Sequence, residues 1–205
     1  MKQPVVKQSV LDQPILKRPV IKRPIIKQLV DLDWETWQGK DPATLVFVIR
    51  DGEILLINKK TGLGKGKVNG PGGNVDPGET PEVCAVRECQ EELSITVSNL
   101  EYCGQHKFQF VDGYSIHVWV YRTRDFDGVP TESREAKPFW APVDKILYEQ
   151  MWEDDQFWLP MVIRGERFTT RWIFDGDHML DYDIQPDGNN ESWGEVHDPK
   201  VWSNT

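Results

Sequence analysis

The stretch Gly73–Ile95, GNVDPGETPEVCAVRECQEELSI, holds the residues that decide the fold of this chain. Thr80-Pro81 is a favourable helix start, because a hydroxyl can cap the first turn and proline lacks only an N–H that would be unpaired there. We therefore expect a helix over most of the stretch. Charged residues stand at characteristic spacings along it: Glu79, then Arg87-Glu88, then Glu91-Glu92.

Three carboxylates of the predicted helix, on Glu88, Glu91 and Glu92, fall within one arc of about 100°. The opposite side carries apolar residues that we expect to pack: Val83, Val86 and Leu93. Crowded carboxylates repel one another unless a cation neutralises them, and Mg²⁺ prefers such oxygen ligands shared with substrate phosphates. A solvated acidic helix face is the alternative interpretation, and the accompanying Arg87 and Glu79 argue against it.

Two glycine-rich segments precede this helix. Gly70-Pro71-Gly72-Gly73 brings bare backbone to the helix start, so that carbonyls can reach a metal and amides can reach phosphate oxygens. An ordinary glycine turn is the alternative. The segment 59–67, KKTGLGKGK, carries four lysines that can attract a triphosphate. A plain solvated loop is the alternative for the lysines other than Lys59, which ends an apolar run.

Composition limits the class of protein. A chain of 205 residues with 39% hydrophobic residues predicts one domain with tails. The net charge of −9 argues against general binding of nucleic acid, although residues 1–30 carry seven basic residues and one acidic residue. Three cysteines without zinc spacing, no apolar run long enough for a membrane span and no signal peptide predict a reduced, cytoplasmic protein.

Residues 4–28 form an imperfect repeat of five residues: PVVKQ, SVLDQ, PILKR, PVIKR and PIIKQ. The recurring prolines forbid a continuous helix and push the residues before them to extended geometry. We expect residues 1–40 to be a basic, extended or disordered tail without a role of its own. A presequence, a tail that contacts nucleic acid or membrane, a tether to a partner and an added edge strand are the alternatives.

Alternating apolar runs predict most strands of a domain over residues 41–185. Thr44–Arg50 and Glu53–Asn58 flank Asp51-Gly52, a hairpin signal. The further strands are expected at Val68–Asn69, Leu100–Val111, Tyr114–Thr123, Phe139–Pro142, Phe168–Phe174 and Met179–Ile184. A second helix is expected at Asp154–Ile163, and residues 186–205 read as a polar tail. This order predicts an α/β fold, a mixed β-sheet sandwiched between α-helices.

The spacing Gly-x5-Glu-x7-Arg-Glu-U-x-Glu-Glu-x-Gly-U, with U apolar, is the Nudix box, and Gly73–Ile95 fits it except at Ser94. Beyond the box the chain resembles the MutT-like 8-oxo-dGTP diphosphatase branch of Nudix hydrolases, above all in MWEDDQFWLP at 151–160. The resemblance implies hydrolysis of oxidised purine nucleoside triphosphates to monophosphate and pyrophosphate, which sanitises the nucleotide pool. Another Nudix nucleotide specificity, or a non-catalytic binding module, is the alternative.

The resemblance also assigns roles to residues of this chain. It implies a bound Mg²⁺, with Mn²⁺ as a substitute, a nucleotide as the only expected partner, and a monomer. The metal ligands would be Gly72 through its carbonyl, Glu88, Glu91, Glu92 and Glu135. The catalytic set would be Glu91, Glu92, Glu88 and Arg87, with Glu91 or Glu92 as the general base and Arg87 paired to Glu79. The substrate would contact Thr44, Lys59, Asn69, Phe108, Trp152, Asp154 and Asp155.

Elementary chemistry agrees with a purine site at residues 152–155. An indole face suits a flat purine, and Trp152 supplies one. Adjacent carboxyl groups in a dry pocket resist double ionisation, so that Asp154 and Asp155 could together donate and accept hydrogen bonds. Helix capping is the alternative for the two aspartates, and a core position is the alternative for Trp152, for Phe108 and especially for Trp158.

Overall fold

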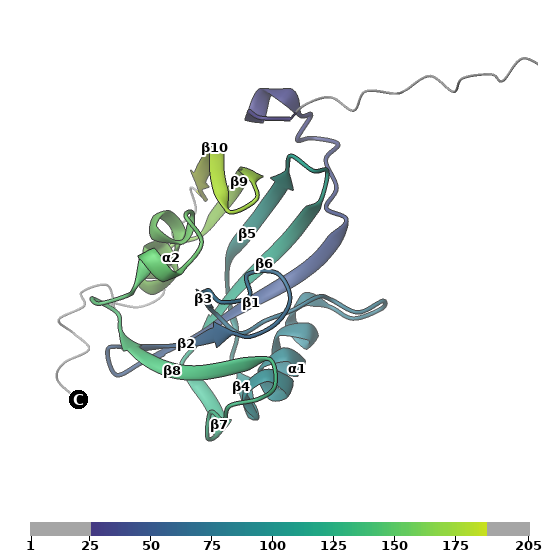
Figure 1. Ribbon diagram of the computed structural model, residues 1–205. Helices are drawn as coiled ribbons and strands as arrows, with labels where there is room; N and C mark the ends of the chain where they lie inside the picture. Colours follow the sequence, from purple (N-terminus) through teal and green to yellow (C-terminus); the bar gives the residue numbers. More distant parts are fainter. Residues whose placement is uncertain (1–25, 188–205) are drawn as a thin grey trace, which may run out of the picture.

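The structure is a computed structural model that describes residues 26–187. A mixed β-sheet forms its centre (Figure 1). Its strand order is β10-β9-β5-β6-β1-β2-β3, and β8 pairs with β2. The strands are β1 (Asp41–Arg50), β2 (Glu53–Lys59), β3 (Val68–Asn69), β5 (Glu101–Phe110), β6 (Ser115–Thr123), β8 (Ala136–Pro142), β9 (Phe168–Asp175) and β10 (His178–Pro186). All the strands expected from the sequence are present, with ends that differ by a few residues.

Tight turns and crossovers set the directions of these strands. Asp51 and Gly52 have φ values of 55° and 77°, the conformation of a two-residue hairpin turn between β1 and β2. β5 and β6 are also antiparallel, whereas β1 runs parallel to β6 and β5 runs parallel to β9. β6 therefore lies between β5 and β1 in the sheet.

The helices α1 (Pro81–Leu93) and α2 (Asp155–Arg164) lie on opposite sides of the sheet (Figure 1), which confirms the predicted fold class. Thr80 caps α1 as expected, because its hydroxyl oxygen accepts a hydrogen bond from the Val83 amide at 3.3 Å. The packed face of α1 consists of Ala85, Cys89 and Leu93. The expectation that Val83 packs is wrong, since it lies in the first turn and is 56% exposed.

Ser94 ends α1 in the left-handed conformation, with φ of 58° and ψ of 32°. Its amide donates to the carbonyl oxygens of Cys89 and Gln90, which closes the last turn. Glycine is favoured at such a position because a side chain costs about 1 kcal/mol or more there. Serine at this position of the box therefore strains the backbone at the end of α1.

Two strands were not anticipated. β4 (Ile95–Ser98) follows α1 directly and pairs with β7 (Asp125–Gly128) in a separate small sheet. β4 alternates apolar and polar residues over only four positions, and β7 is largely exposed with a single apolar residue, so both signals are short. A short 3₁₀ helix, η2 (Tyr148–Gln150), leads into the segment before α2.

The last part of the predicted N-terminal tail packs on the domain. Within residues 26–40, the 3₁₀ helix η1 (Leu29–Asp31) contacts β9 and β10, and the Leu29 amide donates to the Asp181 carboxylate at 2.8 Å. Trp34 is buried, and its ring lies 5.6 Å from that of Trp37. Residues 26–40 therefore differ from the expected extended or disordered chain, while most of the five-residue repeat lies outside the described residues.

Cys84, Cys89 and Cys103 are free and buried. No helix in residues 26–187 is long and apolar enough to cross a bilayer. Of the predicted tail at 186–205, only the first two residues are described.

Candidate active site

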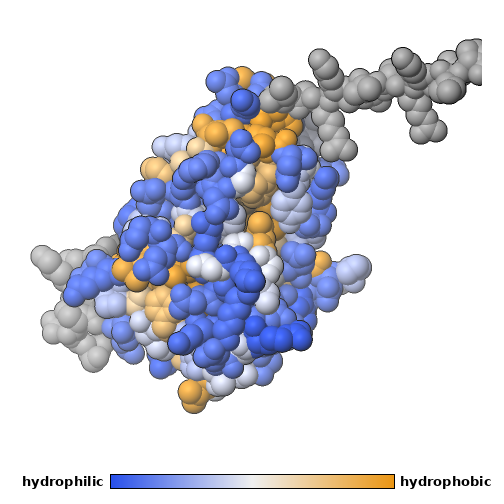
Figure 2. All heavy atoms as spheres, viewed as in Figure 1, coloured by the Kyte–Doolittle hydropathy of each residue, from blue (hydrophilic) through white to orange (hydrophobic). Residues whose placement is uncertain are grey.

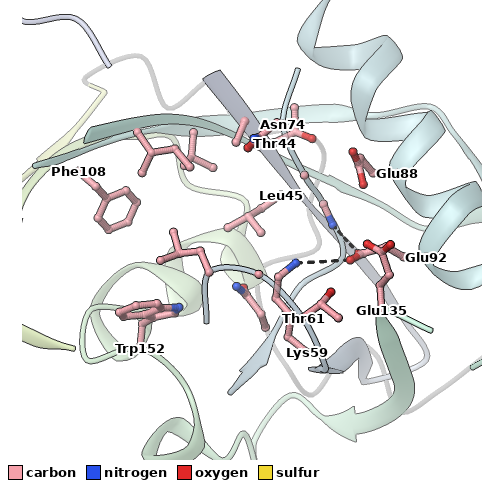
Figure 3. Close-up of a pocket in the computed structure, with 18 of the residues that line it drawn as sticks. Thr44, Leu45, Lys59, Thr61, Asn74, Glu88, Glu92, Phe108, Glu135 and Trp152 are labelled. Atoms are coloured by element: carbon pink, nitrogen blue, oxygen red, sulfur yellow. Dashed lines mark hydrogen bonds and ion pairs between the residues drawn. The ribbon is translucent and has the colours of Figure 1, made fainter. Parts of the chain in front are cut away.

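A pocket of about 490 Å³ opens between the sheet, the glycine loop before α1 and the start of α2. Its two ends differ in chemistry. The acidic end contains Glu88, Glu92, Glu135 and Lys59, and the aromatic end contains Phe108, Phe110, Trp152, Trp158, Phe174, Asp154 and Asp155. Figure 3 shows this separation, with Glu88, Glu92 and Glu135 on one side and Phe108 and Trp152 on the other. Figure 2 shows hydrophilic residues over much of the face in view, with hydrophobic residues gathered in smaller patches.

Glu92 is the most buried carboxylate of the acidic end, at 3% exposure. One of its oxygens accepts a hydrogen bond from the Gly72 amide at 3.0 Å, and the other lies 3.5 Å from the Lys59 ammonium (Figure 3). Burial raises the pKa of Glu92, and the positive charge of Lys59 opposes the rise. Burial likewise raises the pKa of Glu88, against the hydrogen bond from Arg87.

The glycine loop approaches these carboxylates because it has no side chains in the way. Gly72 has φ of 151°, and a Cβ on it would collide with the Thr44 carbonyl. A Cβ on Gly73 would collide with the carboxylate of Glu88. The backbone of the loop therefore lies directly against the acidic end, as the sequence predicted.

Arg87 holds the loop and the helix together. It donates to both oxygens of Glu79 at 2.9 Å, to the Asn74 carbonyl at 3.0 Å, and to Glu88 at 2.7 Å. The hydrogen bonds that Arg87 donates to Glu79, followed by the bond from the Asp76 amide, lower the pKa of Glu79 to about 2. The predicted pairing of Arg87 with Glu79 is therefore present, and it orders the loop from Asp76 to Glu79 through a further bond from the Asp76 amide to Glu79.

Glu91 differs from the other carboxylates of the box. It is absent from the pocket lining, its side chain is 60% exposed, and it pairs with Arg87 at 3.2 Å. The four lysines of segment 59–67 also separate: Lys59 lines the pocket, Lys60 pairs with Glu132, and Lys67 pairs with Asp177. Lys65 is exposed.

The donor set at the acidic end suits a hard divalent cation. Glu88, Glu92 and Glu135 offer only oxygen donors, which is the ligand type of Mg²⁺ and Mn²⁺. Within residues 26–187, no three acidic, histidine or cysteine side chains lie close enough together to form a ready-made metal site. Arg87 pairs with Glu88, and Lys59 pairs with Glu92. The three carboxylates are thus of the ligand type that such an ion prefers, and they line one pocket.

The aromatic end is a slot lined by several aromatic rings. The ring of Phe174 lies 6.0 Å from that of Phe108 and 5.8 Å from that of Trp152, which meets it edge-on at 87°. Phe110, two residues after Phe108 on the same face of β5, also lines the slot. Flat apolar walls of this kind suit a heteroaromatic ring.

Asp154 and Asp155 are 2% and 3% exposed at the aromatic end. Asp154 accepts a hydrogen bond from the Trp158 indole N–H at 2.9 Å, while its second oxygen is buried without a partner. Asp155 accepts from the Trp152 amide at 3.0 Å. Burial raises the pKa of Asp154 to about 7, and burial together with the charge of Asp154 raises the pKa of Asp155.

Residues 152–158 include both pocket-lining and core positions. Asp154 stands at the N-cap of α2 without a side-chain capping hydrogen bond, so the capping interpretation is wrong for it. Asp155 lies in the first turn and accepts from the Trp152 amide, which precedes the helix, so it does not cap a first-turn amide either. Trp158 is a core residue at 1% exposure that also lines the pocket, and Trp152 is a pocket residue of intermediate exposure. Phe108 lines the pocket and packs against the core.

Two further predicted residues lie in the pocket. Thr44 is buried, with its hydroxyl 3.4 Å from the Cys84 sulfur, and Asn69 accepts a hydrogen bond from the Gly70 amide at 2.8 Å. Sequence reasoning gave no role to several other lining residues: Thr61, Asn74, Asp76, Phe110 and Tyr114. Only Phe110 had a usable signal, the two-residue period that places it on the same face as Phe108.

The chain belongs to the Nudix family: residues 39–162 match the NUDIX domain. It is 42% identical over 144 residues to an oxidized purine nucleoside triphosphate hydrolase of Danio rerio, covering 67% of this chain and 92% of that protein. It is 37% identical over 144 residues to the protein of the same name from Mus musculus, with 69% and 92% covered.

A solved structure supports the fold independently. The Mutator MutT protein of Bacillus halodurans superposes with a TM-score of 0.65 at 24% identity, over 71% of this chain and 97% of that one. The sheet and both helices are therefore the Nudix fold, and divalent metal ions are the general requirement of Nudix hydrolases.

Proposed function

We propose that this protein hydrolyses oxidised purine nucleoside triphosphates, such as 8-oxo-dGTP and 2-hydroxy-dATP, to the monophosphate and pyrophosphate. The carrying observation is one pocket that joins the acidic end to an aromatic slot containing two buried aspartates. The two relatives at 42% and 37% identity, named for oxidised purine nucleoside triphosphates, support the same substrate class.

The aromatic end would read the base. A purine would stack in the slot beside Trp152 and Phe108, with Asn69 at its edge. The unpartnered oxygen of Asp154 is available for the Watson–Crick or Hoogsteen edge of the base. If Asp154 and Asp155 share one proton, one donates and the other accepts, which suits the altered donor pattern of an oxidised purine.

The acidic end would carry the chemistry. We propose that Glu88, Glu91, Glu92, Glu135 and the carbonyl of Gly72 hold Mg²⁺, or Mn²⁺ in its place. A bound divalent ion would neutralise phosphate charge and lower the pKa of an attacking water. Glu91 or Glu92 would accept the proton of that water. Lys59 and Thr44 would contact the nucleotide, and Arg87 would keep the loop in place.

A nucleotide panel tests this proposal. Hydrolysis of 8-oxo-dGTP, 2-hydroxy-dATP, O6-methyl-dGTP, dGTP, dATP and ADP-ribose would be followed in Mg²⁺, with pyrophosphate and monophosphate measured separately. We expect a clear preference for the oxidised purines, with pyrophosphate as product. Preference for O6-methyl-dGTP, or equal turnover of ordinary nucleotides, would replace the substrate class. No turnover with retained binding would indicate a non-catalytic module.

Two properties of the molecule in the cell complete the proposal. We propose a cytoplasmic monomer whose only required partner is the nucleotide. Sedimentation of the purified protein would test the monomer, and localisation of the full chain would test the compartment. Deletion of residues 1–25 should leave activity and location unchanged if that segment has no role.

A further inference from the structure

The wall of the pocket formed by Trp152 is supported from outside by a lysine. The ammonium of Lys67 lies 4.9 Å from the centroid of the Trp152 ring and 3.1 Å from the carboxylate of Asp177. A cation over an indole face is attracted by the ring quadrupole. Trp152 lines the pocket and Lys67 does not, so the lysine contacts the indole from behind the pocket wall.

The backbone around Lys67 fixes where its side chain points. Its carbonyl accepts a hydrogen bond from the Lys59 amide at 2.9 Å, and its amide donates to the Gly64 carbonyl at 2.9 Å. Gly64 itself lies against Trp152, since a Cβ on it would stand 2.9 Å from the indole nitrogen. The loop 60–67 thus meets Trp152 at two points, and its Leu63 lines the same pocket.

The turn between β9 and β10 anchors both sides of this contact. Asp177 of the turn pairs with Lys67 from the loop. Just beyond the turn, the Met179 amide donates to Glu153 at 2.7 Å, and His178 lies 3.0 Å from the same carboxylate. The loop 60–67 and the segment that carries Trp152 are therefore tied to one turn, far from both in sequence.

We propose that Lys67, held by Asp177, is a positioning residue that fixes Trp152 and the loop 60–67 around the base. This inference rests on the proposed function for the identity of the base. Without the cation, the loop and the indole would spend part of the time away from the arrangement that receives a purine. The apparent affinity for the nucleotide falls in proportion to the fraction of protein in the binding-competent arrangement. We therefore expect KM to rise and kcat to change little.

Steady-state kinetics on the full chain test this inference, with the preferred nucleotide of the wild type as substrate. For Lys67→Met, which keeps the aliphatic stem and removes the charge, we expect KM to rise by about threefold to tenfold with kcat within about twofold. Lys67→Arg retains a cation for Trp152 and Asp177 and should restore most of the affinity. Asp177→Asn should give a smaller rise, because Asp177 is 68% exposed.

Lys65→Met is the matched control, since Lys65 is an exposed lysine of the same loop. We expect it to retain the kinetic constants of the wild type. An unchanged KM in Lys67→Met would overturn the inference, and so would an equal effect of Lys65→Met. A loss of kcat at constant KM would also overturn it, because that pattern would place Lys67 in the chemistry.

A measurement without nucleotide separates this inference from the proposed function. Amide hydrogen exchange of residues 60–68 and 150–156 should become faster in Lys67→Met and remain unchanged in Lys65→Met. This result would support the positioning role of Lys67 even if the wild type preferred an ordinary nucleotide. Unchanged exchange in both variants would reject the positioning role of Lys67, whatever the substrate proves to be.

Discussion

The acidic end and the aromatic end of the pocket come from the chain in different ways. Two carboxylates of the acidic end, Glu88 and Glu92, lie with the glycine loop within the contiguous residues 72–92. The aromatic end takes side chains from β5, from β9 and from the start of α2. Chemistry encoded in one stretch can be recognised from spacing alone, whereas recognition of the base requires the tertiary fold.

The two ends also differ in how charge is tolerated. Glu92 is buried beside a lysine and a backbone amide, which compensate its charge directly. Asp154 is buried beside aromatic rings with a single donor, so its charge is compensated poorly and its pKa rises to about 7. Burial thus raises the pKa of carboxyl groups at both ends, and at the acidic end the charge of Lys59 opposes the rise for Glu92.

The largest expected effect comes from Glu92→Gln. Removal of this carboxylate should lower kcat by about 10²- to 10⁴-fold for every nucleotide, because both metal binding and proton acceptance depend on it. Pyrophosphate release at saturating Mg²⁺ is the measurement. Glu82→Gln, an exposed carboxylate on the same helix, is the control and should keep full activity. Equal kcat in Glu92→Gln and the wild type would remove Glu92 from the chemistry.

Asp154→Asn should act on selectivity. If the amide oxygen keeps the bond from Trp158, the substitution replaces the unpartnered carboxyl oxygen, which can accept or donate, by an NH₂ group that can only donate. A mismatched hydrogen bond of this kind is worth roughly tenfold to hundredfold in discrimination. We expect kcat/KM for 8-oxo-dGTP to fall by that factor while dGTP changes less. Asp175→Asn, at the exposed end of β9, serves as the control. A parallel loss for both nucleotides would mean that Asp154 does not read the oxidised edge.

Stability as a function of pH should report the same carboxyl group. The pKa of Asp154 lies above its unfolded value of 3.8, so the folded state binds the additional proton between about pH 4 and 7. Stability should therefore be greatest below pH 4 from this group and decline as pH rises to about 7.

Asp154→Asn should remove that decline and raise stability at pH 8 by roughly 2–4 kcal/mol, with little gain near pH 4. Urea unfolding of both proteins at the two pH values measures the difference. A gain of the same size at pH 4 would show that ionisation is not its source.

The smallest expected effect concerns the end of the box helix. Ser94→Gly should raise stability by about 1 kcal/mol, because glycine adopts φ of 58° without strain. Activity should remain unchanged, since Ser94 lies outside the pocket lining. Ser94→Ala keeps the strained Cβ and should give no such gain. A gain in Ser94→Ala would assign the effect to the hydroxyl instead.

Local signals predicted most of the fold. Asp51-Gly52 and Thr80-Pro81 fixed a turn and a helix start through backbone preferences that need no tertiary partner. The strand β7 pairs with β4, and Trp34 contacts Lys107 of β5 and Arg171 of β9. These partners are distant in sequence and left no local pattern. Val83 was expected to pack because helical periodicity says which side a residue faces and not how far the sheet extends.

The same limit applies to the pocket. Glu88 and Glu92 follow from spacing, and the structure places both in the lining. Asp154 and Asp155 could be proposed for the base only through a family resemblance, because adjacent acidic residues before a helix usually act as caps. The support that Lys67 gives to Trp152 crosses three segments, and nothing in the lysine-rich loop distinguishes Lys67 from Lys65.

The most direct test of separate roles for the two ends is the ratio of kcat/KM for 8-oxo-dGTP to that for dGTP in three proteins: wild type, Glu92→Gln and Asp154→Asn. We predict that Glu92→Gln loses activity on both nucleotides and keeps the wild-type ratio, whereas Asp154→Asn lowers the ratio and keeps turnover of dGTP. A changed ratio in Glu92→Gln, or an unchanged ratio in Asp154→Asn, would contradict the assignment of chemistry to the acidic end and of base recognition to the aromatic end.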